Sequence, residues 1–538
     1  MEPVKREVSE AENVSRAAGT VGFYTFLSRI LGLVRDVVVA RFFGAGMAAD
    51  AFFVAFRIPN LLRRLFAEGS LTIAFIPVFT EYLTRKSRHE AFQMARAALT
   101  LLSLVLILVA LSGVLLSPWI VRAQAFGFGG SGAKYELTVL LTRITFPYIF
   151  LVSLVAFFMG VLNSLKHFAA PAAAPIFLNV GIIGATLWLS PYFDQPIISV
   201  AIGVIIGGVL QVALQIPWLV EKGVSLMPCW MPEHPAVRRV GLLMLPAVFG
   251  SAIYQLNQFI GTLLASFLQE GSISWLYYAD RIVEFPLGVF AIAVSTAALP
   301  SLSKQAAAGR LSEFKDTLAH SLKLVFFITF PAMAGMIILR EPIVRIIFQR
   351  GAFDALSTDM TSVARLFYSV GVWGFSASPV MVSAFYALQD TKTPVKVAAV
   401  AMAANGTLSL LLMGPLTHGG LALALSLAST LQFFLLVFLL KKKQGIFDLA
   451  PLLRTVLRSV AASLIMGLIV FFLNSHWMAQ AGTGSFLIAA AKLCVTVLAG
   501  GTAYFVAAAF LRCPELSSIG VLFRPVMQKL KAKRDLDA

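Results

Sequence analysis

Residues 97–116 read AALTLLSLVLILVALSGVLL, a run of twenty residues without a charged side chain. About twenty apolar residues in a helix are enough to cross the hydrocarbon core of a bilayer, so this run predicts a membrane span. The rest of the chain has the same character. Of its 538 residues 59% are hydrophobic and 13% are charged, and its mean hydropathy is +0.85. Soluble domains carry about 45–50% apolar and about 25% charged residues. The sequence therefore predicts a membrane protein.

Further apolar segments of similar length lie on both sides of this run. Together they predict an all-α polytopic protein with fourteen transmembrane helices. The segments lie near residues 21–45, 50–82, 93–117, 137–163, 171–190, 196–220, 238–267, 273–300, 318–338, 360–388, 395–414, 420–440, 453–473 and 485–511.

Lysines and arginines are unevenly divided among the turns between these segments. The even-numbered turns hold clusters such as 85–88 and 441–443. Four of the odd-numbered turns have neither Lys nor Arg, namely 191–196, 268–272, 414–419 and 474–484. The positive-inside rule then places both termini in the cytoplasm. Because the formal charge of +17 is scattered over short loops and forms no basic motif, nucleic acid is not an expected partner.

The chain also resembles itself at a spacing of about 224 residues. Arg57 and Arg281 both stand in an Ala-x-Arg-Ile context and lie 224 residues apart, as do Pro118 and Pro342. Pro171 with Pro394 and Arg143 with Arg365 repeat the spacing to within two residues. These pairs predict the duplication of a six-helix unit, with the two copies parallel and the substrate between them.

The duplication predicts how the chain is divided. We expect two pseudo-symmetric six-helix lobes, two helices outside the duplication, and short polar ends. The expected parts are a cytoplasmic N-terminal segment (1–20), an N-lobe (21–222), a C-lobe (223–443), two additional helices (444–511) and a basic cytoplasmic tail (512–538).

Charged side chains interrupt three of the predicted spans. An arginine at the centre of a spanning helix costs about 2.5–3.5 kcal/mol on insertion scales, so these side chains are expected to face a water-filled interior. They are Arg29, Arg35 and Asp36 in the first span, Asp50, Arg57, Arg63, Arg64 and Glu68 in the second, and Asp280, Arg281 and Glu284 in the eighth.

Two interpretations of these charges stay open. The carboxylates can pair with the arginines and hold helices together, as the spacing of Arg64 and Glu68 suggests. Alternatively, the cluster binds a pyrophosphate, because guanidinium groups form paired hydrogen bonds to phosphate. Arg29 favours the second interpretation, since it has no acidic residue three or four positions away.

Motifs of catalysis and of metal binding are absent from the sequence. The six histidines and three cysteines are solitary, and no GxSxG, P-loop or HExxH pattern occurs. We therefore expect no enzymatic activity, no metal site and no cofactor.

The charged segments resemble a known family. The runs 28–36, 49–53, 57–69 and 277–281 are similar to those of the MurJ/MviN family of lipid II flippases, within the multidrug/oligosaccharidyl-lipid/polysaccharide exporter superfamily. The resemblance covers essentially the whole chain. It implies two six-helix lobes that form a V, and two C-terminal helices that line a groove for a lipid tail.

The resemblance also implies a substrate and a site. The substrate would be lipid II, the undecaprenyl-pyrophosphate-linked peptidoglycan precursor, flipped by alternating access from the cytoplasmic to the periplasmic leaflet of the bacterial inner membrane. The partners would be lipid II and membrane lipids, with other cell-wall synthesis proteins as candidates and a monomer as the default state. The family's cavity residues correspond to Arg29, Arg35, Arg63, Arg281 and Asp50.

The coupling ion and two rival functions stay open. Some relatives hold sodium with an aspartate in the seventh helix, but here that helix has Gln255, Asn257 and Gln258, so the site is not carried over. Na⁺, H⁺ or Cl⁻ remain candidates. The rivals are a flippase for another polyprenyl-linked glycan and a cation or drug antiporter of the same fold, which would need a cavity dominated by carboxylates.

Overall fold

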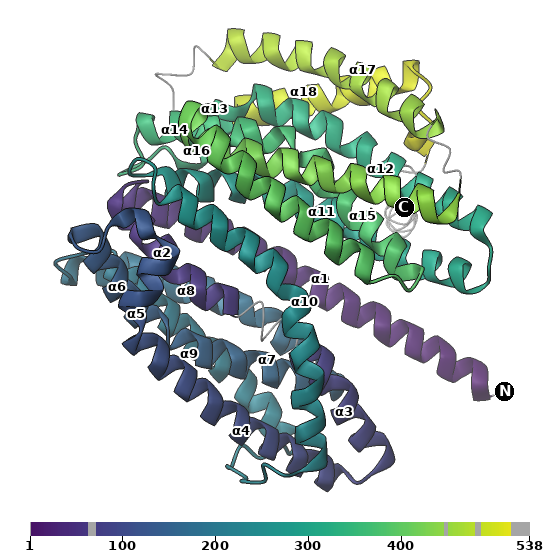
Figure 1. Ribbon diagram of the computed structural model, residues 1–538. Coiled ribbons are helices and arrows are strands. Elements are labelled where there is room, and N and C mark those ends of the chain that lie inside the picture. Colours follow the sequence, from purple (N-terminus) through teal and green to yellow (C-terminus); the bar gives the residue numbers. More distant parts are fainter. Residues whose placement is uncertain (1, 63–70, 446–449, 479–485, 518–538) are drawn as a thin grey trace, which may run out of the picture. The chain divides into compact units, whose positions relative to one another are not determined.

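The computed structural model describes the backbone of residues 2–62, 71–445, 450–478 and 486–517, and every regular element in those ranges is a helix. The chain divides into two compact units. Unit 1 comprises residues 1–277 with 350–357, and unit 2 comprises 278–349 with 358–538. Figure 1 shows the helices of each unit in the colours of the sequence.

Unit 1 contains ten complete helices and the first turns of an eleventh. They are α1 (Glu2–Phe43), α2 (Met47–Leu62), α3 (Leu71–Arg85), α4 (Arg88–Leu115), α5 (Ser117–Gln124), α6 (Ala133–Thr145), α7 (Tyr148–Ser164), α8 (Ala169–Leu189), α9 (Ile198–Glu221), α10 (Pro235–Ala265) and the start of α11 (Ser272–Ala307). Short 3₁₀ turns follow α5 and α8, at Phe126–Phe128 and Ser190–Tyr192.

Unit 2 contains the rest of α11 and seven further helices. They are α12 (Leu311–Ile338), α13 (Arg340–Phe348), α14 (Ala355–Val370), α15 (Val372–Ala387), α16 (Lys392–Gln444), α17 (Ala450–Leu473) and α18 (Phe486–Phe510). A single π turn, Asn474–Met478, follows α17.

The described residues of the fourteen predicted spans lie mostly in helices, which confirms the polytopic all-α fold. Among the described residues, eight helices are long and apolar enough to cross a membrane, or nine if α14 and α15, bent by 42°, form one span. The stretch Lys392–Lys443 covers two predicted spans and is kinked at Thr417. The remaining predictions coincide with α1, α10 and α11, whose apolar stretches carry polar or charged residues, and with α2 and α3, too short to cross alone at 16 and 15 residues.

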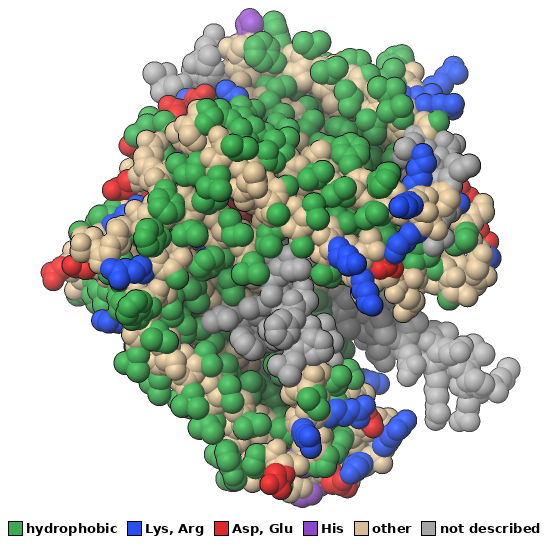
Figure 2. All heavy atoms as spheres, in the orientation of Figure 1, with side chains coloured by type: hydrophobic (Ala, Val, Ile, Leu, Met, Phe, Trp, Pro, Cys, Tyr) green, Lys and Arg blue, Asp and Glu red, His purple; other side chains and the backbone are tan. Residues whose placement is uncertain are grey.

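Exposed apolar side chains fit a bilayer rather than water. On α4, Leu108 and Leu111 are each 57% exposed, and on α17 Leu468 is 72% exposed. Figure 2 shows hydrophobic side chains over broad parts of the visible face. Soluble monomers rarely expose contiguous apolar surface on this scale.

The duplication is visible in the backbone. α7 and α15 begin 224 residues apart, and each is followed by a turn with a non-glycine residue in the left-handed region, Lys166 (φ 61°) and Gln389 (φ 60°). These two residues lie 223 positions apart, the spacing of the landmarks in the sequence. Because left-handed backbone is uncommon outside glycine, its recurrence at equivalent positions supports the duplication.

The division by packing differs from the division expected from the duplication. The sequence places the boundary at residues 222/223, whereas the compact units divide within α11 at Tyr277. The reason is that α10 packs against α3, α4 and α5 of unit 1. The sequence repeat and the packing of helices define domain boundaries by different criteria. The lobes expected from the repeat therefore stay a prediction.

Each unit has its own apolar core. In unit 1, Phe75, Phe79, Met94 and Phe157 pack together, and α8 and α9 approach closely because a Cβ at Gly181 would lie 2.5 Å from the backbone nitrogen of Gly207. Small residues of this kind let membrane helices touch. In unit 2 the core is built by α11, α12, α15 and α16, and a second cluster packs the last two helices on α12 through Phe327, Met466, Val470 and Tyr504.

Candidate functional site

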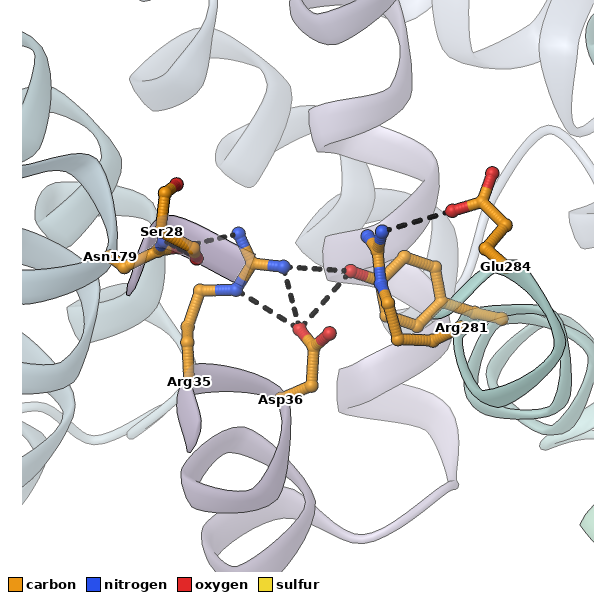
Figure 3. A network of polar contacts seen from close by, with 7 residues as sticks. Ser28, Arg35, Asp36, Asn179, Arg281 and Glu284 are labelled. Atoms are coloured by element: carbon orange, nitrogen blue, oxygen red, sulfur yellow. Dashed lines mark hydrogen bonds and ion pairs between the residues drawn. The ribbon is translucent and has the colours of Figure 1, made fainter. Parts of the chain in front are cut away.

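The charges of the first predicted span form a hydrogen-bonded network in unit 1. Arg35 Nη2 lies 2.7 Å from Asp36 Oδ1, and Arg35 Nε is 3.0 Å from the same oxygen. Asn179 Oδ1 of α8 accepts from Arg35 Nη1 at 3.2 Å, and the Tyr277 hydroxyl donates to Asp36 Oδ1 at 3.2 Å. Asp36 is 2% exposed, so its charge is compensated mainly by its neighbour in the chain. Figure 3 shows this arrangement.

Packing of α8 against α1 brings Asn179 to this network. The Asn179 amide also donates to the Ser28 carbonyl at 3.2 Å, and the nearest atom to a Cβ at Gly32 would be Asn179 Nδ2 at 3.8 Å. One amide thus bridges two turns of the same helix and fixes the orientation of the Arg35 guanidinium. A polar side chain in the apolar α8 was the only sequence signal for this role.

Arg29 differs from its neighbours on α1. Its side chain is partly buried, and within the part of the chain that the structure describes its guanidinium makes no hydrogen bond or ion pair. Asp36 lies on the same helix face, seven residues on, but its carboxylate accepts from Arg35. Arg29 therefore adds a positive charge that no carboxylate among the described residues pairs with, and its donors can contact a ligand.

Asp50 of α2 caps the start of α11. Its carboxylate accepts from the backbone N–H groups of Gly271 and Ser274 at 2.8 and 2.9 Å, from the Ser274 hydroxyl at 2.7 Å, and from Lys134 Nζ at 2.8 Å. A carboxylate at a helix N-terminus satisfies unpaired donors and complements the helix dipole. Gly271 is required here, because its φ is +92° and a Cβ would lie 2.5 Å from the Ala45 carbonyl oxygen.

The Arg57 side chain also connects two helices. Its guanidinium donates to the backbone carbonyl of Gln258 at 3.2 Å and to the Thr262 hydroxyl, both on α10. It therefore ties α2 to α10 within unit 1. The sequence placed Arg57 among the supporting charges, and that assignment stays a prediction.

The charges of the eighth predicted span lie in unit 2. Arg281 Nη1 and Glu284 Oε2 are 3.2 Å apart, one turn of α11 apart, and their side chains are 35% and 42% exposed. Asp280 beside them is partly exposed. Arg281 points toward Glu284 in Figure 3. A pair this exposed adds about 0–1 kcal/mol of stability.

Three of the predicted residues, Arg63, Arg64 and Glu68, lie outside the described residues. Conversely, the structure adds side chains that the sequence did not single out, namely Asn179, Tyr277, Lys134 and Ser274. Among the described residues, no group of three or more His, Cys, Asp or Glu could hold a metal ion.

Two units of long apolar helices, with arginines and carboxylates placed on the helices themselves, define a polytopic membrane carrier. The sequence of residues 39–492 matches the family described as "Lipid II flippase MurJ". The "Probable lipid II flippase MurJ" of Vibrio cholerae serotype O1 is 40% identical over 437 residues, which cover 80% of this chain and 83% of the relative. This chain belongs to the MurJ family of bacterial inner-membrane proteins.

Solved structures agree with that assignment. A structure of "Lipid II flippase MurJ, inward closed conformation" is 28% identical, has a TM-score of 0.76, and covers 91% of this chain and 98% of its own. An inward-facing multidrug resistance MATE family transporter of the MOP superfamily has a TM-score of 0.66 at 13% identity, and covers 77% of this chain and 96% of its own. The second likeness shows that the fold is shared and nothing further.

Proposed function

We propose that this chain flips lipid II across the bacterial cytoplasmic membrane, from the cytoplasmic to the periplasmic leaflet, and catalyses no covalent reaction. Membership of the MurJ family supports the substrate. The observation that carries the mechanism is Arg29, a guanidinium in the apolar part of α1 without a carboxylate partner among the described residues. A pyrophosphate supplies the oxygens that such a group lacks.

The other charges take supporting roles in this mechanism. Asp36 and Asn179 hold the Arg35 guanidinium in one orientation, and its positive charge lies on the same helix as that of Arg29. Arg281 and Arg63 are retained from the sequence as predicted binding residues. Asp50 acts as a positioning residue, because its carboxylate accepts hydrogen bonds from the start of α11 and from Lys134.

The antiporter rival is disfavoured by the same contacts. An exporter of cations needs carboxylates that can exchange a proton or bind a cation. In unit 1 Asp36 is bonded to Arg35, and Asp50 to Lys134 and the start of α11. A flippase for another polyprenyl-linked glycan would use the same phosphate chemistry, so only the substrate can distinguish it.

Membrane potential can drive the cycle in this scheme. With both termini in the cytoplasm, each anionic charge carried outward across an inside-negative membrane gains about 2.3 kcal/mol per 100 mV. The empty, positive site returns in the favourable direction. A coupling ion is then unnecessary in this scheme. We take the working unit to be one chain, with other cell-wall synthesis proteins as candidate partners.

The proposal is tested by Arg29→Ala in cells depleted of their own lipid II flippase, with Arg143→Ala as the matched control. Arg143 is an exposed arginine of α6. Loss of one charge-assisted contact of about 1.5–3 kcal/mol lowers transport more than ten-fold, so Arg29→Ala should not sustain growth, and Arg143→Ala should. The measurement is growth together with the amount of lipid II exposed on the outer leaflet.

Full rescue by Arg29→Ala at normal protein levels would refute the role of Arg29. The two flippase functions are separated by transport assays with the unaltered chain. Transport of lipid II without transport of a different polyprenyl-pyrophosphate glycan would support the lipid II function, and the reverse result would support the other one.

A further inference from the structure

The connection between α9 and α10 is held in a fixed shape on the surface of unit 1. It runs from Lys222 to His234 without regular structure. Side chains of α4 fasten its backbone at three points. Arg88 Nη2 donates to the Lys222 carbonyl at 2.7 Å, Arg96 Nε donates to the Met227 carbonyl at 3.0 Å, and the Cys229 N–H donates to the Thr100 hydroxyl at 2.8 Å.

This fixed connection presents two large apolar side chains outward. Met227 is 70% exposed and Trp230 is 64% exposed, whereas Val224 in the same connection is 5% exposed and packs into the core of unit 1. Burial of apolar area is favourable, so a connection free to fold back would cover these side chains. Here the hydrogen bonds hold the backbone so that both side chains remain outside.

Basic side chains surround this apolar pair. The ring centroids of His234 and Tyr82 lie 5.8 Å apart, and Arg239 bonds to Glu81 at 2.8 Å, which places the start of α10 at the end of α3. Arg85 and Lys86 are 80% and 50% exposed there. Figure 2 shows lysines and arginines gathered at this end of unit 1. The side chains of this region are Arg85, Lys86, Arg88, Arg96, Lys222, Arg238 and Arg239, against Glu81, Glu90, Glu221 and Glu233, a net charge of +3.

We propose that Met227 and Trp230, with the basic ends of α3, α4 and α10, form a docking surface for the anionic phospholipids of the adjoining leaflet. Tryptophan favours the boundary between headgroups and acyl chains. Lysine and arginine near the surface attract anionic headgroups. Immediately along α4, exposed Leu104, Leu108 and Leu111 continue the apolar face that lies in the hydrocarbon. The side chains of this surface therefore follow the layers of a leaflet. The basic side chains match the headgroups, Trp230 matches the boundary, and the leucines match the acyl chains.

The consequence for the molecule is a fixed depth for unit 1 at this boundary. Because Arg96 and Thr100 hold the connection on α4, the lipids that bind Trp230 also hold α4 and the start of α10 at one level of the membrane. This role concerns bulk phospholipid and does not depend on the proposed transport of lipid II.

The test places a spin label at single positions of the full-length chain, with Cys229, Cys494 and Cys513 replaced by Ser. Labels go at Met227→Cys and Trp230→Cys, and at Glu233→Cys as the matched control, an exposed position of the same connection. The protein is reconstituted in phosphatidylcholine vesicles with or without phosphatidylglycerol. The measurement compares collision of each label with lipid-dissolved oxygen and with a water-soluble paramagnetic reagent.

We expect labels 227 and 230 to be protected from the aqueous reagent and label 233 to remain accessible, with protection increased by phosphatidylglycerol. The variant Arg85→Gln/Lys86→Gln should abolish the extra protection that phosphatidylglycerol gives to labels 227 and 230, because each basic residue near the surface attracts anionic headgroups. Lys441→Gln/Lys442→Gln, which removes two charges at the end of α16, should leave label 230 unchanged.

The proposal is overturned if labels 227 and 230 are as accessible to the aqueous reagent as label 233 in the anionic vesicles. It is also overturned if the effect of phosphatidylglycerol survives Arg85→Gln/Lys86→Gln. Protection that appears only when lipid II is added to neutral vesicles would assign this surface to the substrate instead.

Discussion

Equivalent positions of the duplicated chain have different roles in the two units. Arg143 on α6 and Arg365 on α14 are 222 residues apart. Arg143 is exposed, whereas Arg365 is 1% exposed and its Nη1 donates to the carbonyls of Leu339 and Arg340 at 3.1 and 2.9 Å. Those carbonyls lie at the break between α12 and α13. The same side chain thus points outward in unit 1 and closes a helix break in unit 2.

For Arg57 and Arg281 the arginine that connects two helices is the one in unit 1. In unit 1 Arg57 is bonded to a backbone carbonyl and a hydroxyl of α10, while in unit 2 Arg281 pairs with a half-exposed carboxylate on its own helix. Duplication therefore fixed where the arginines stand in the sequence, and later packing decided which of them hold the protein together.

The largest expected effect is the difference in stability between Arg365→Ala and Arg143→Ala. Removing the buried Arg365 leaves two carbonyls without donors and opens a cavity, and should cost about 3–5 kcal/mol. The exposed Arg143→Ala should change stability by less than about 0.5 kcal/mol. The measurement is thermal unfolding of each purified variant in the same detergent.

Arg365→Met sharpens this comparison, because it keeps much of the volume but not the hydrogen bonds. It should fall between the other two variants. If Arg143→Ala and Arg365→Ala unfold at the same temperature, the two positions are not distinguished by packing and the comparison fails.

A smaller difference is expected between Arg57→Met and Glu284→Gln. Arg57→Met removes charge-assisted hydrogen bonds to α10 and should cost about 1.5–3 kcal/mol. Glu284→Gln weakens one half-exposed ion pair and should cost less than about 1 kcal/mol. Thermal unfolding in detergent measures both, and Thr262→Val should reproduce part of the Arg57→Met effect. A Glu284→Gln variant as unstable as Arg57→Met would show that the eighth-span charges are structural.

These pairs also show which features of the structure can be predicted from the sequence. Periodicity and span length predicted the helices, and the cost of charge in a bilayer predicts that Arg29, Arg35 and Asp36 face an interior. Local patterns could not show that Asp50 caps α11, because Gly271 and Ser274 are more than 220 residues away. Nor could they distinguish Arg143 from Arg365, which have the same type and the same place in the repeat. Such roles depend on long-range packing.

The smallest expected effect concerns the duplicated turns after α7 and α15. His167 in the first turn and Asp390 in the second occupy equivalent positions of the repeat, 223 residues apart. His167 stacks on Trp218 at 4.5 Å, and burial together with Lys222 holds its pKa below the ordinary 6.5. Asp390 bonds to Lys443 and to the Thr393 hydroxyl, and these contacts hold the pKa of its carboxyl below the ordinary 3.8.

Both turns therefore lose stability on acidification, but in different ranges of pH. A histidine with a lowered pKa favours the folded state above pH 6.5 and loses that contribution as the pH falls further. Asp390 contributes above pH 3.8 and loses its contribution only below it. Acidification from about pH 7.5 to 5 should thus weaken the turn of unit 1 and leave that of unit 2 intact.

His167→Gln should flatten the change in unfolding temperature between about pH 7.5 and 5, whereas Asp390→Asn should lower that temperature equally at both values. Because each turn contributes one contact to a chain of 538 residues, each difference should amount to no more than about 1 °C. Thermal unfolding at the two pH values in one detergent measures them. If Asp390→Asn removed the slope and His167→Gln did not, the chemistry of the two turns would be the reverse of the one their contacts indicate.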